Sequence, residues 1–305
     1  MVRSSHPSSF ASAALEDWHR SGRRFLHRGH SVFYRDDGRA GADVLLCMHG
    51  FPTASWDWHR LWPELTARWR VLAIDMIGYG FSDKPRRYRY SLLDQADVYE
   101  EILDSLGVRR VHLLAHDVGD SVAQELLARH VERTDGGGLS IASACLLNGG
   151  LFAETHRPTV TQRILASPAG FLAARLMTEG IFGASFSEVF GPHTKPATSE
   201  LGEFWSLIDF NDGARIAHRL IRYMVERRVH RQRWVGALHA EIPLRVINGA
   251  DDPVSGAHMI DRLREELPEV DVISLHGIGH YPQIEDPDGV LRAYLEFRSR
   301  LEMLA

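Results

Sequence analysis

One stretch of the sequence, residues 113–130, constrains the fold and the chemistry of this chain more than any other. It is LLAHDVGDSVAQELLARH, in which an apolar run is followed by one acidic residue, Asp117, and then by apolar residues at helical spacing. The pattern predicts a strand, a sharp turn and a helix. Ala115 and Gly119 lie two residues on either side of Asp117, and such small neighbours let a strand and a helix approach closely around a strained apex residue. This spacing is typical of a nucleophile elbow.

The apex residue is Asp, where a nucleophile elbow usually carries Ser. A carboxylate is ionised at neutral pH and needs no base to become a nucleophile. The first turn of a helix favours its charged form, because the macrodipole and free backbone N–H groups face it. Attack on a carbonyl would give only an anhydride, so a carboxylate nucleophile suits a strained or activated sp3 carbon. Asp is also common as a helix N-cap, and the elbow by itself leaves that structural role equally open.

Buried strands alternate with helices on both sides of this elbow. Continuous apolar runs at 44–50, 71–75 and 141–150 are typical of strands that are buried on both faces. Helical patterns separate these runs, and the alternation resumes at 244–254. The sequence therefore predicts an α/β fold with a mostly parallel sheet that is covered by helices on both sides.

From Leu151 to about Leu238 the buried strands vanish. Helical segments are expected there at 162–177, 201–208 and 213–229. A parallel sheet tolerates such an interruption only as an excursion between two of its strands, so this region is predicted to be a helical lid. The predicted organisation is a first part of the core at residues 1–150, the lid at 151–238 and a second part of the core at 239–305.

Two acid–base candidates follow later strands, where a parallel sheet places its functional loops. Asp251 and Asp252 follow one predicted strand, and His280, in the loop GIGHYP, follows the next. We favour Asp252 because it immediately precedes a proline in a G-x-x-D-P pattern, and Asp251 could instead be a turn residue. The chain has 17 histidines, and position alone distinguishes His280 from the others. The order nucleophile, acid, base is that of a hydrolase triad, so we expect Asp117, Asp252 and His280 to converge.

The composition argues against several classes of protein. A formal net charge of −5 with 25% charged residues indicates neither a nucleic-acid nor a membrane partner, and no stretch approaches the roughly twenty apolar residues of a membrane span. The arginine-rich run at 227–233 is interpreted as the solvated face of a lid helix. Cys47 and Cys145 are expected to be buried, reduced thiols, and no metal site or cofactor is predicted. The N-terminus has no apolar run of signal-peptide length, so a cytoplasmic location is expected.

Several motifs together resemble the α/β-hydrolase superfamily, in the Asp-nucleophile branch of epoxide hydrolases and haloalkane dehalogenases. They are HGFPT (49–53), DMIGYGFSDKP (75–85), AHDVGD (115–120), GADDPV (249–254) and GIGHYPQIEDP (277–287). Other segments resemble the mesoderm-specific transcript homologue subgroup, which is epoxide-hydrolase-like. They are LFAETHRP (151–158), VFGPHTKP (189–196), NDG (211–213), RWVGAL (233–238) and HYPQIEDP (280–287). The resemblance covers the chain from about Trp18 onwards.

The resemblance implies an α/β-hydrolase fold with a helical lid inserted between two halves of the core. It also suggests the opening of small apolar epoxides to vicinal diols. In this hypothesis Asp117 attacks a ring carbon to form a covalent alkyl-aspartate, and His280, oriented by Asp252, activates the water that hydrolyses it. The backbone N–H groups of Phe51 and Val118 would hold the oxyanion. Because His280 must be neutral in the second step, activity is expected to fall as the pH drops.

The acid in the lid separates the two leading functions. In similar epoxide hydrolases, lid tyrosines protonate the departing alkoxide. Tyr223 is the only tyrosine between residues 151 and 238, so it is the candidate donor, with His156 as a possible second donor. The alternative is a structural role, in which Tyr223 packs with Ile216 and Leu220 on one face of a helix.

A haloalkane dehalogenase that uses the same chemistry on small apolar halides is the alternative function. Similar dehalogenases hold the halide with side-chain N–H groups beside the oxyanion hole, but Phe51 and Val118 carry no such donor. Fluoroacetate dehalogenases carry an arginine next to the nucleophile, which is also missing here. Trp205 in the lid remains as a candidate halide contact. A non-catalytic binding protein with the same fold is the third hypothesis, and the sequence makes no prediction of the oligomeric state.

Overall fold

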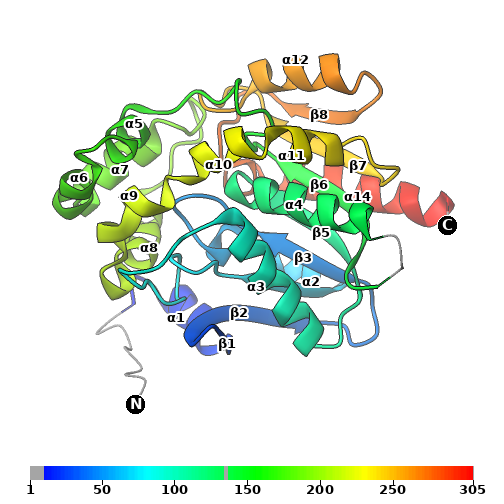
Figure 1. Ribbon diagram of the computed structural model, residues 1–305, viewed down its shortest axis with the longest axis horizontal. Helices are drawn as coiled ribbons and strands as arrows, with labels where there is room; N and C mark the ends of the chain where they lie inside the picture. The colour runs from blue at the N-terminus through cyan, green and yellow to red at the C-terminus, as the bar shows by residue number, and fades with distance from the viewer. Residues whose placement is uncertain (1–9, 134–136, 305) are drawn as a thin grey trace.

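The computed structural model describes residues 10–133 and 137–304, and in it one β-sheet is enclosed by helices (Figure 1). Within these residues the sheet has eight strands, in the order β1-β2-β4-β3-β5-β6-β7-β8. They are β1 (Arg23–His27), β2 (His30–Gly38), β3 (Val44–Met48), β4 (Arg70–Ile74), β5 (Arg110–His116), β6 (Ser140–Leu147), β7 (Leu244–Gly249) and β8 (Asp271–Leu275). The N-terminal residues 1–9, which we considered for a signal peptide, lie outside the described part of the chain.

The sheet is mostly parallel, as the sequence predicts. β1 pairs with β2 and β2 pairs with β4 in antiparallel fashion, and every pair from β4 through β3, β5, β6 and β7 to β8 is parallel. The core helices are α1 (Ala13–Arg20), η1 (Ser55–Trp58), α2 (Trp62–Thr66), α3 (Leu92–Ser105), α4 (Val118–Glu132), α12 (Ala257–Glu266), α13 (Pro282–Glu285) and α14 (Pro287–Leu304). The carboxyl ends of the parallel strands therefore meet along one edge of the sheet.

The two faces of the sheet carry separate hydrophobic clusters. Successive side chains of a strand point to opposite faces, and β3 shows the consequence. Leu46 and Met48 belong to one cluster with residues of α3 and α4, whereas Leu45 and Cys47 belong to the other with residues of α2 and α14. Both clusters exclude water from the sheet, which holds the strand ends rigidly. Cys47 and Cys145 are buried and free, as predicted.

A helical region is inserted between β6 and β7, and we call it the lid. It contains α5 (Val160–Ala166), α6 (Gly170–Leu176), α7 (Glu179–Ser187), α8 (Thr198–Asp209), η2 (Phe210–Ile216), α9 (Ala217–Leu220), α10 (Tyr223–Val229) and α11 (Arg231–Ala237). Figure 1 shows α5 to α9 gathered beyond one end of the sheet and α11 running beside α4. The predicted outer bounds of the lid, 151 and 238, stay a prediction.

The lid helices are shorter and more numerous than the sequence predicts. The helix expected at 162–177 is broken between α5 and α6 at Pro168, because proline lacks a backbone N–H group and disfavours helical geometry in the residue before it. The segment expected as one helix at 213–229 contains η2, α9 and α10. Just before it, Asn211 and Asp212 have positive φ angles of 55° and 60°, which interrupt the helix that precedes them. Helix α7 was not predicted.

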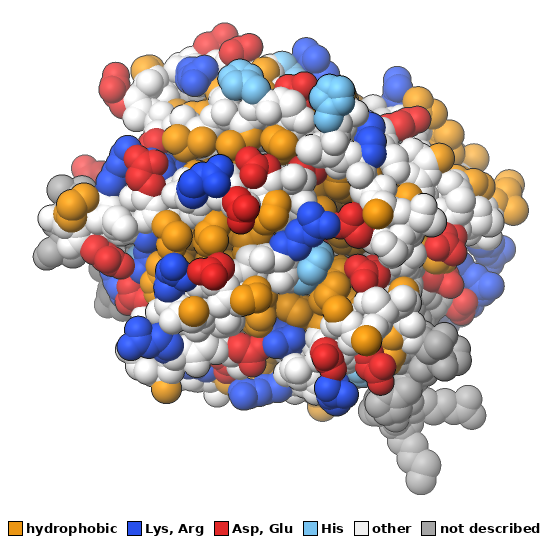
Figure 2. Space-filling model, turned by 180° about the vertical axis from the view of Figure 1, so that it is seen from behind, with side chains coloured by type: hydrophobic (Ala, Val, Ile, Leu, Met, Phe, Trp, Pro, Cys, Tyr) orange, Lys and Arg blue, Asp and Glu red, His pale blue; other side chains and the backbone are white. Residues whose placement is uncertain are grey.

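Within the described residues, no helix is both long enough and apolar enough to cross a membrane. Figure 2 shows acidic and basic side chains intermixed over one face of the molecule, with apolar side chains between them. That face therefore carries no broad field of one sign.

Candidate active site

Asp117 lies at the turn between β5 and α4, where the sequence predicts it. Its φ of 48° and ψ of −105° are rare for an L-residue, so the surrounding structure holds it in a strained conformation. A Cβ atom at Gly119 would lie 2.6 Å from the carbonyl oxygen of Met48, so this close approach requires glycine. The Asp117 side chain caps no backbone N–H group of the described helix α4. Asp117 therefore occupies the N-cap position of α4 without making the side-chain hydrogen bond of a structural N-cap.

Three groups surround the carboxylate of Asp117. The backbone N–H of Phe51 donates to Oδ2 at 3.0 Å, which is the contact expected of an oxyanion-hole donor. Nε2 of His280 lies 3.9 Å from the same oxygen. Nη2 of Arg227 donates to the other oxygen, Oδ1, at 3.1 Å. Val118 is buried at the start of α4, and its N–H as a second oxyanion donor stays a prediction.

His280 and Asp252 form a tightly held pair beside the nucleophile. Nδ1 of His280 lies 2.7 Å from Oδ2 of Asp252. That carboxylate also accepts hydrogen bonds from Asn148 Nδ2 and Ser255 Oγ, each at 2.9 Å. Asp251, in contrast, is exposed and accepts a hydrogen bond from the backbone N–H of Gly277. The geometry therefore favours Asp252 over Asp251 as the partner of the histidine.

Two carboxylates and two cations share this buried site. Burial lowers the pKa of His280, but the carboxylates of Asp252 and Asp117 outweigh it and raise the pKa to about 10. Burial raises the pKa of Asp117, but the neighbouring His280 and Arg227 outweigh it, so the pKa lies well below its usual range. At neutral pH the free site therefore holds ionised Asp117 and protonated His280. The sequence predicts a neutral His280 only for the second step, and that expectation stays a prediction.

Arg227 corrects the interpretation of the arginine-rich run. That run was predicted to be a solvated face, but Arg227 is only 3% exposed and reaches the nucleophile from helix α10. Arg228 is exposed, and Arg233 makes ion pairs with glutamates of α4. Tyr223, one helical turn before Arg227, is also buried. The i, i+4 spacing of Tyr223 and Arg227 was the one sign in the sequence that both side chains lie on the same, buried face of the helix. Arg227, which is distant from Asp117 in sequence, thus lies beside it in the structure.

The two predicted lid donors lie close to Arg227. The hydroxyl of Tyr223 accepts a hydrogen bond from Gln162 Nε2 at 3.2 Å, which leaves its own proton without an acceptor among the described residues. Burial raises the pKa of Tyr223. The Tyr223 ring belongs to the same buried cluster as Ile216 and Leu220. The three residues lie on α10, η2 and α9, so the single helix face of the structural alternative is not present. Nδ1 of His156 lies 3.5 Å from Nη1 of Arg227.

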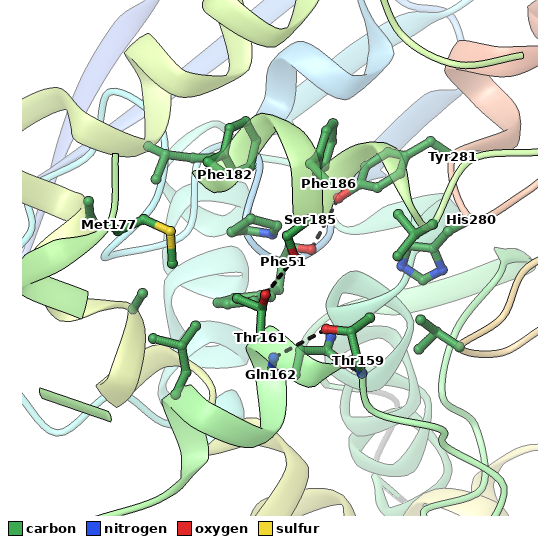
Figure 3. A pocket seen from close by; sticks show the side chains of 17 residues that line it. Phe51, Thr159, Thr161, Gln162, Met177, Phe182, Ser185, Phe186, His280 and Tyr281 are labelled. Atoms are coloured by element: carbon green, nitrogen blue, oxygen red, sulfur yellow. Dashed lines mark hydrogen bonds between the residues drawn. The ribbon is translucent and has the colours of Figure 1, made fainter. Parts of the chain in front are cut away.

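A cavity of about 80 Å³ opens beside His280, mostly between lid helices. Figure 3 shows His280 and Tyr281 on one side of it and Met177 on the opposite side. Its lining is mainly apolar, and Ser185 of α7 donates a hydrogen bond to Thr161 of α5 at 2.7 Å across the lid. The lining therefore offers mainly apolar contacts to a bound molecule.

Trp205 has no place at this pocket. It packs against Phe182, with ring centroids 5.8 Å apart, and is not among the residues that line the cavity. The predicted halide contact from its indole N–H therefore lacks support in the structure.

Sequence reasoning also missed two buried polar residues near the triad, Asn148 directly after β6 and Asp120 in α4. Asn148 has a positive φ of 45° and links Asp252 to the backbone N–H of Gly249. Asp120, three residues after the nucleophile, is fully buried, and neither of its oxygens has a hydrogen-bond partner among the described residues. Burial and the charge of Asp117 raise its pKa well above the usual range. The only sequence signal for Asn148 was its position directly after the apolar run at 141–147.

Comparisons with known proteins identify the fold family of this chain. The family model described as the alpha/beta hydrolase fold matches residues 43–287. The mesoderm-specific transcript homolog protein of Homo sapiens is 44% identical over 303 residues, which cover 95% of this chain and 90% of that protein. LipZ of Mycobacterium tuberculosis, which is named as a hydrolase, is 39% identical over 287 residues, covering 93% of this chain and 98% of that protein.

Among solved structures, haloalkane dehalogenase DbeA from Bradyrhizobium elkani is similar with a TM-score of 0.78. The match covers 93% of this chain and 99% of that structure at 22% sequence identity. At this identity the likeness concerns the fold alone. It supports the arrangement of sheet, elbow and lid described above.

Proposed function

Because this chain belongs to the α/β-hydrolase fold family and is related to the mesoderm-specific transcript proteins, we propose that it opens epoxides to vicinal diols through a covalent alkyl-aspartate. The observation that carries the proposal is the ionised carboxylate of Asp117 at the apex of the elbow, 3.9 Å from His280. A carboxylate in this position attacks carbon without a general base.

The first step breaks a carbon–oxygen bond of the epoxide. An oxygen of Asp117 attacks the ring carbon, and the ring oxygen takes the bonding electron pair as an alkoxide. Tyr223 is the proposed proton donor to this alkoxide, since its hydroxyl proton has no acceptor among the described residues. Once Asp117 is esterified, its charge no longer raises the pKa of His280. His280 then gives up its proton, which replaces the proton that the Tyr223 hydroxyl donated to the alkoxide. The step ends with a neutral imidazole.

The second step hydrolyses the ester. Neutral His280, held by Asp252 at 2.7 Å, removes a proton from water, and the hydroxide attacks the carboxyl carbon of Asp117. The oxyanion forms on the oxygen that faces the backbone N–H of Phe51. Collapse breaks the bond between the carboxyl carbon and the substrate oxygen, and this oxygen takes the proton of the added hydroxyl group to complete the diol. Asp117 is left ionised and His280 protonated. One epoxide and one water are consumed for each diol.

This proton balance favours epoxides over halides. A departing alkoxide needs a proton, and the protonated His280 of the free site supplies one. A departing halide needs none, so His280 would have to lose its proton to solvent before the second step. Haloalkane dehalogenation remains the second candidate because the cationic side chain of Arg227 offers a counter-ion for a halide beside Asp117. The haloalkane dehalogenase named among the structural neighbours makes this alternative worth testing.

The test uses styrene oxide and 1-bromobutane with the wild type and with Asp117→Asn. Diol formation supports the epoxide hydrolase, and halide release supports the dehalogenase. Asp117→Asn should lower the rate by about a thousandfold or more, because the amide is a poor nucleophile. A single turnover in heavy-oxygen water should place one labelled oxygen in the peptide that contains Asp117. Full turnover by Asp117→Asn, or no label in that peptide, would refute the proposal.

A further inference from the structure

Arg227 occupies a position that the proposed mechanism does not explain. Its Nε donates to Ser121 Oγ at 2.7 Å, and its Nη2 donates to the backbone carbonyl oxygen of Asp117 at 2.9 Å as well as to Oδ1. The guanidinium carbon lies 4.6 Å from the centroid of the Tyr223 ring. A Cβ atom at Gly150 would come within 2.5 Å of Nη1, so the end of β6 is shaped to leave room for the guanidinium. The core thus holds this lid side chain in a fixed place.

The ion pair between Arg227 and Asp117 poses a chemical problem. Alkylation removes the negative charge of Asp117, and a cation 3.1 Å from Oδ1 stabilises the charge that the reaction must remove. After alkylation Arg227 would also remain as a buried cation without a counter-ion, which is strongly unfavourable. A second anion bound at the same guanidinium would relieve both costs.

The free donors around Arg227 indicate what this anion is. The planar guanidinium matches the two oxygens of a carboxylate. Burial and the charge of Arg227 lower the pKa of His156 to about 3, so its imidazole is neutral. Because Nδ1 of His156 faces the donor Nη1, the proton lies on Nε2. That Nε2 atom is buried and has no partner among the described residues. A buried N–H donor beside the guanidinium therefore lacks an acceptor.

We propose that Arg227 binds a carboxylate carried by the substrate, so that the preferred substrates are 2,3-epoxy acids with an apolar tail. This inference rests on the proposed function and specifies its substrate class. The substrate carboxylate takes the place of Asp117 Oδ1 at the guanidinium, while Ser121 and the carbonyl oxygen of Asp117 keep Arg227 in position. The released Oδ1 is then a stronger nucleophile, and Arg227 keeps a counter-ion throughout the cycle.

The apolar pocket accommodates the remainder of such a substrate. Gln162, labelled in Figure 3, lines the pocket and donates to the hydroxyl of Tyr223, whose ring in turn lies against Arg227. Gln162 and Tyr223 thus lie between the cavity and the guanidinium, and the substrate carboxylate must displace them to reach Arg227. In such an acid the epoxide ring is next to the carboxylate. The carboxylate would then lie at Arg227, the ring at Asp117 and the apolar tail among the lid side chains.

The test compares trans-3-phenylglycidate with trans-3-phenylglycidamide, which have the same ring system and differ in charge. The wild type should show a kcat/KM for the acid that is about tenfold to a hundredfold higher than for the amide, which is the usual contribution of a charge-assisted hydrogen bond. Arg227→Gln should abolish this preference, and Arg227→Lys should keep part of it. Arg228→Gln, which changes the exposed neighbour on α10, should behave as the wild type.

The outcomes separate this inference from the proposed function. Equal or faster turnover of the amide by the wild type, or an unchanged preference in Arg227→Gln, would overturn it. A purely structural role for Arg227 would lower both rates by the same factor. If Arg227→Gln does not fold, the acid-over-amide preference of the wild type and of Arg227→Lys still tests the inference. Opening of styrene oxide without opening of the acid would overturn the carboxylate site and leave the proposed function standing. If no epoxide is opened at all, both fail together.

Discussion

At the scale of single residues, the site is a buried set of paired charges. Asp117 contacts Arg227 through one oxygen and lies near His280 through the other, and His280 is bonded to Asp252. Each charge is stabilised only by its neighbours, because burial penalises all of them. The chemistry of the site therefore depends on the order in which charges appear and disappear. One substitution experiment and one pH-titration experiment follow from this.

Replacing Asp252 should separate the two chemical steps. In Asp252→Asn the imidazole of His280 loses the acceptor at 2.7 Å that orients it and raises its pKa. Hydrolysis of the alkyl-enzyme should slow by about a thousandfold, whereas alkylation should change much less. Mass spectrometry should then detect the ester on the peptide containing Asp117. The control is Asp251→Asn, since Asp251 is exposed and does not contact His280. Fast turnover by Asp252→Asn with no accumulated ester would contradict the assignment.

The two steps should also differ in their dependence on pH. The pKa of Asp117 is lowered, so the nucleophile stays ionised in acid and alkylation should persist well below pH 7. Hydrolysis needs a neutral His280 in the alkyl-enzyme, so its rate should fall as the pH drops. In the free protein His280 has a pKa of about 10, so epoxide alkylation should fall above that pH as its proton is lost. Rapid-quench kinetics would measure the rates of alkylation and of hydrolysis at each pH. Alkylation and hydrolysis that fall together in acid would refute this scheme.

At the scale of secondary-structure elements, the site depends on how closely the end of β6 approaches helix α10. Asn148 directly follows β6 and donates to Asp252, and a Cβ atom added at Gly150, three residues after β6, would meet Arg227. Helix α10 supplies Arg227 and Tyr223 on one face. The lid and the core therefore share the functional groups at this junction, and steric space there is limited.

Gly150→Ala tests this junction. The new Cβ atom would lie 2.5 Å from Nη1 of Arg227, so the guanidinium must shift away from Asp117. We expect a loss of about 1–3 kcal/mol in the free energy of unfolding, measured with urea, together with reduced alkylation. Gly180→Ala in α7 is the matched control, because nothing lies within 4 Å of its new Cβ. It should be neutral or slightly stabilising, as expected for alanine in a helix. Wild-type stability and activity in Gly150→Ala would show that Arg227 is not tightly held.

At the scale of the whole molecule, several buried contacts tie the lid to the core. Besides the pair formed by Arg227 and Asp117, Glu226 accepts hydrogen bonds from Ser91 Oγ and from the backbone N–H of Leu92 at the start of α3. Nζ of Lys84 donates to the carbonyl oxygen of Leu207 in α8 at 3.1 Å. These contacts lie on separate lid helices, so the lid is held at more than one point.

We therefore expect the lid helix α10 and the core strand β5 to open together. In native-state hydrogen exchange, amides of α10 and of β5 should be protected by similar free energies, because the buried ion pair must break in either opening. Mass spectrometry of the corresponding peptides measures both. The exposed helix α6, which shares none of these contacts, is the internal reference and should exchange faster. Exchange of α10 at the rate of α6 would contradict a lid fixed to the core.

Much of the fold and part of the site follow from local patterns in the chain. The strand, turn and helix around Asp117 are visible because apolar periodicity changes where the backbone changes direction. The convergence of Asp117, Asp252 and His280 follows because all three come after parallel strands, whose carboxyl ends meet at one edge. Pro168 breaks a lid helix for a reason that is also local. The apolar and aromatic residues on both sides of it favoured the prediction of one continuous helix.

The sequence by itself determined the parallel sheet, the elbow with its carboxylate and the position of the acid and the base along the chain, because each depends on neighbouring residues or on strand direction. Only the tertiary structure decided that Arg227 turns inward to Asp117 and that Trp205 lies away from the pocket. The direction in which a lid helix presents each side chain is set by packing against a distant part of the chain, and local spacing does not encode that contact. The same packing brings the charges together and so decides the protonation of His280.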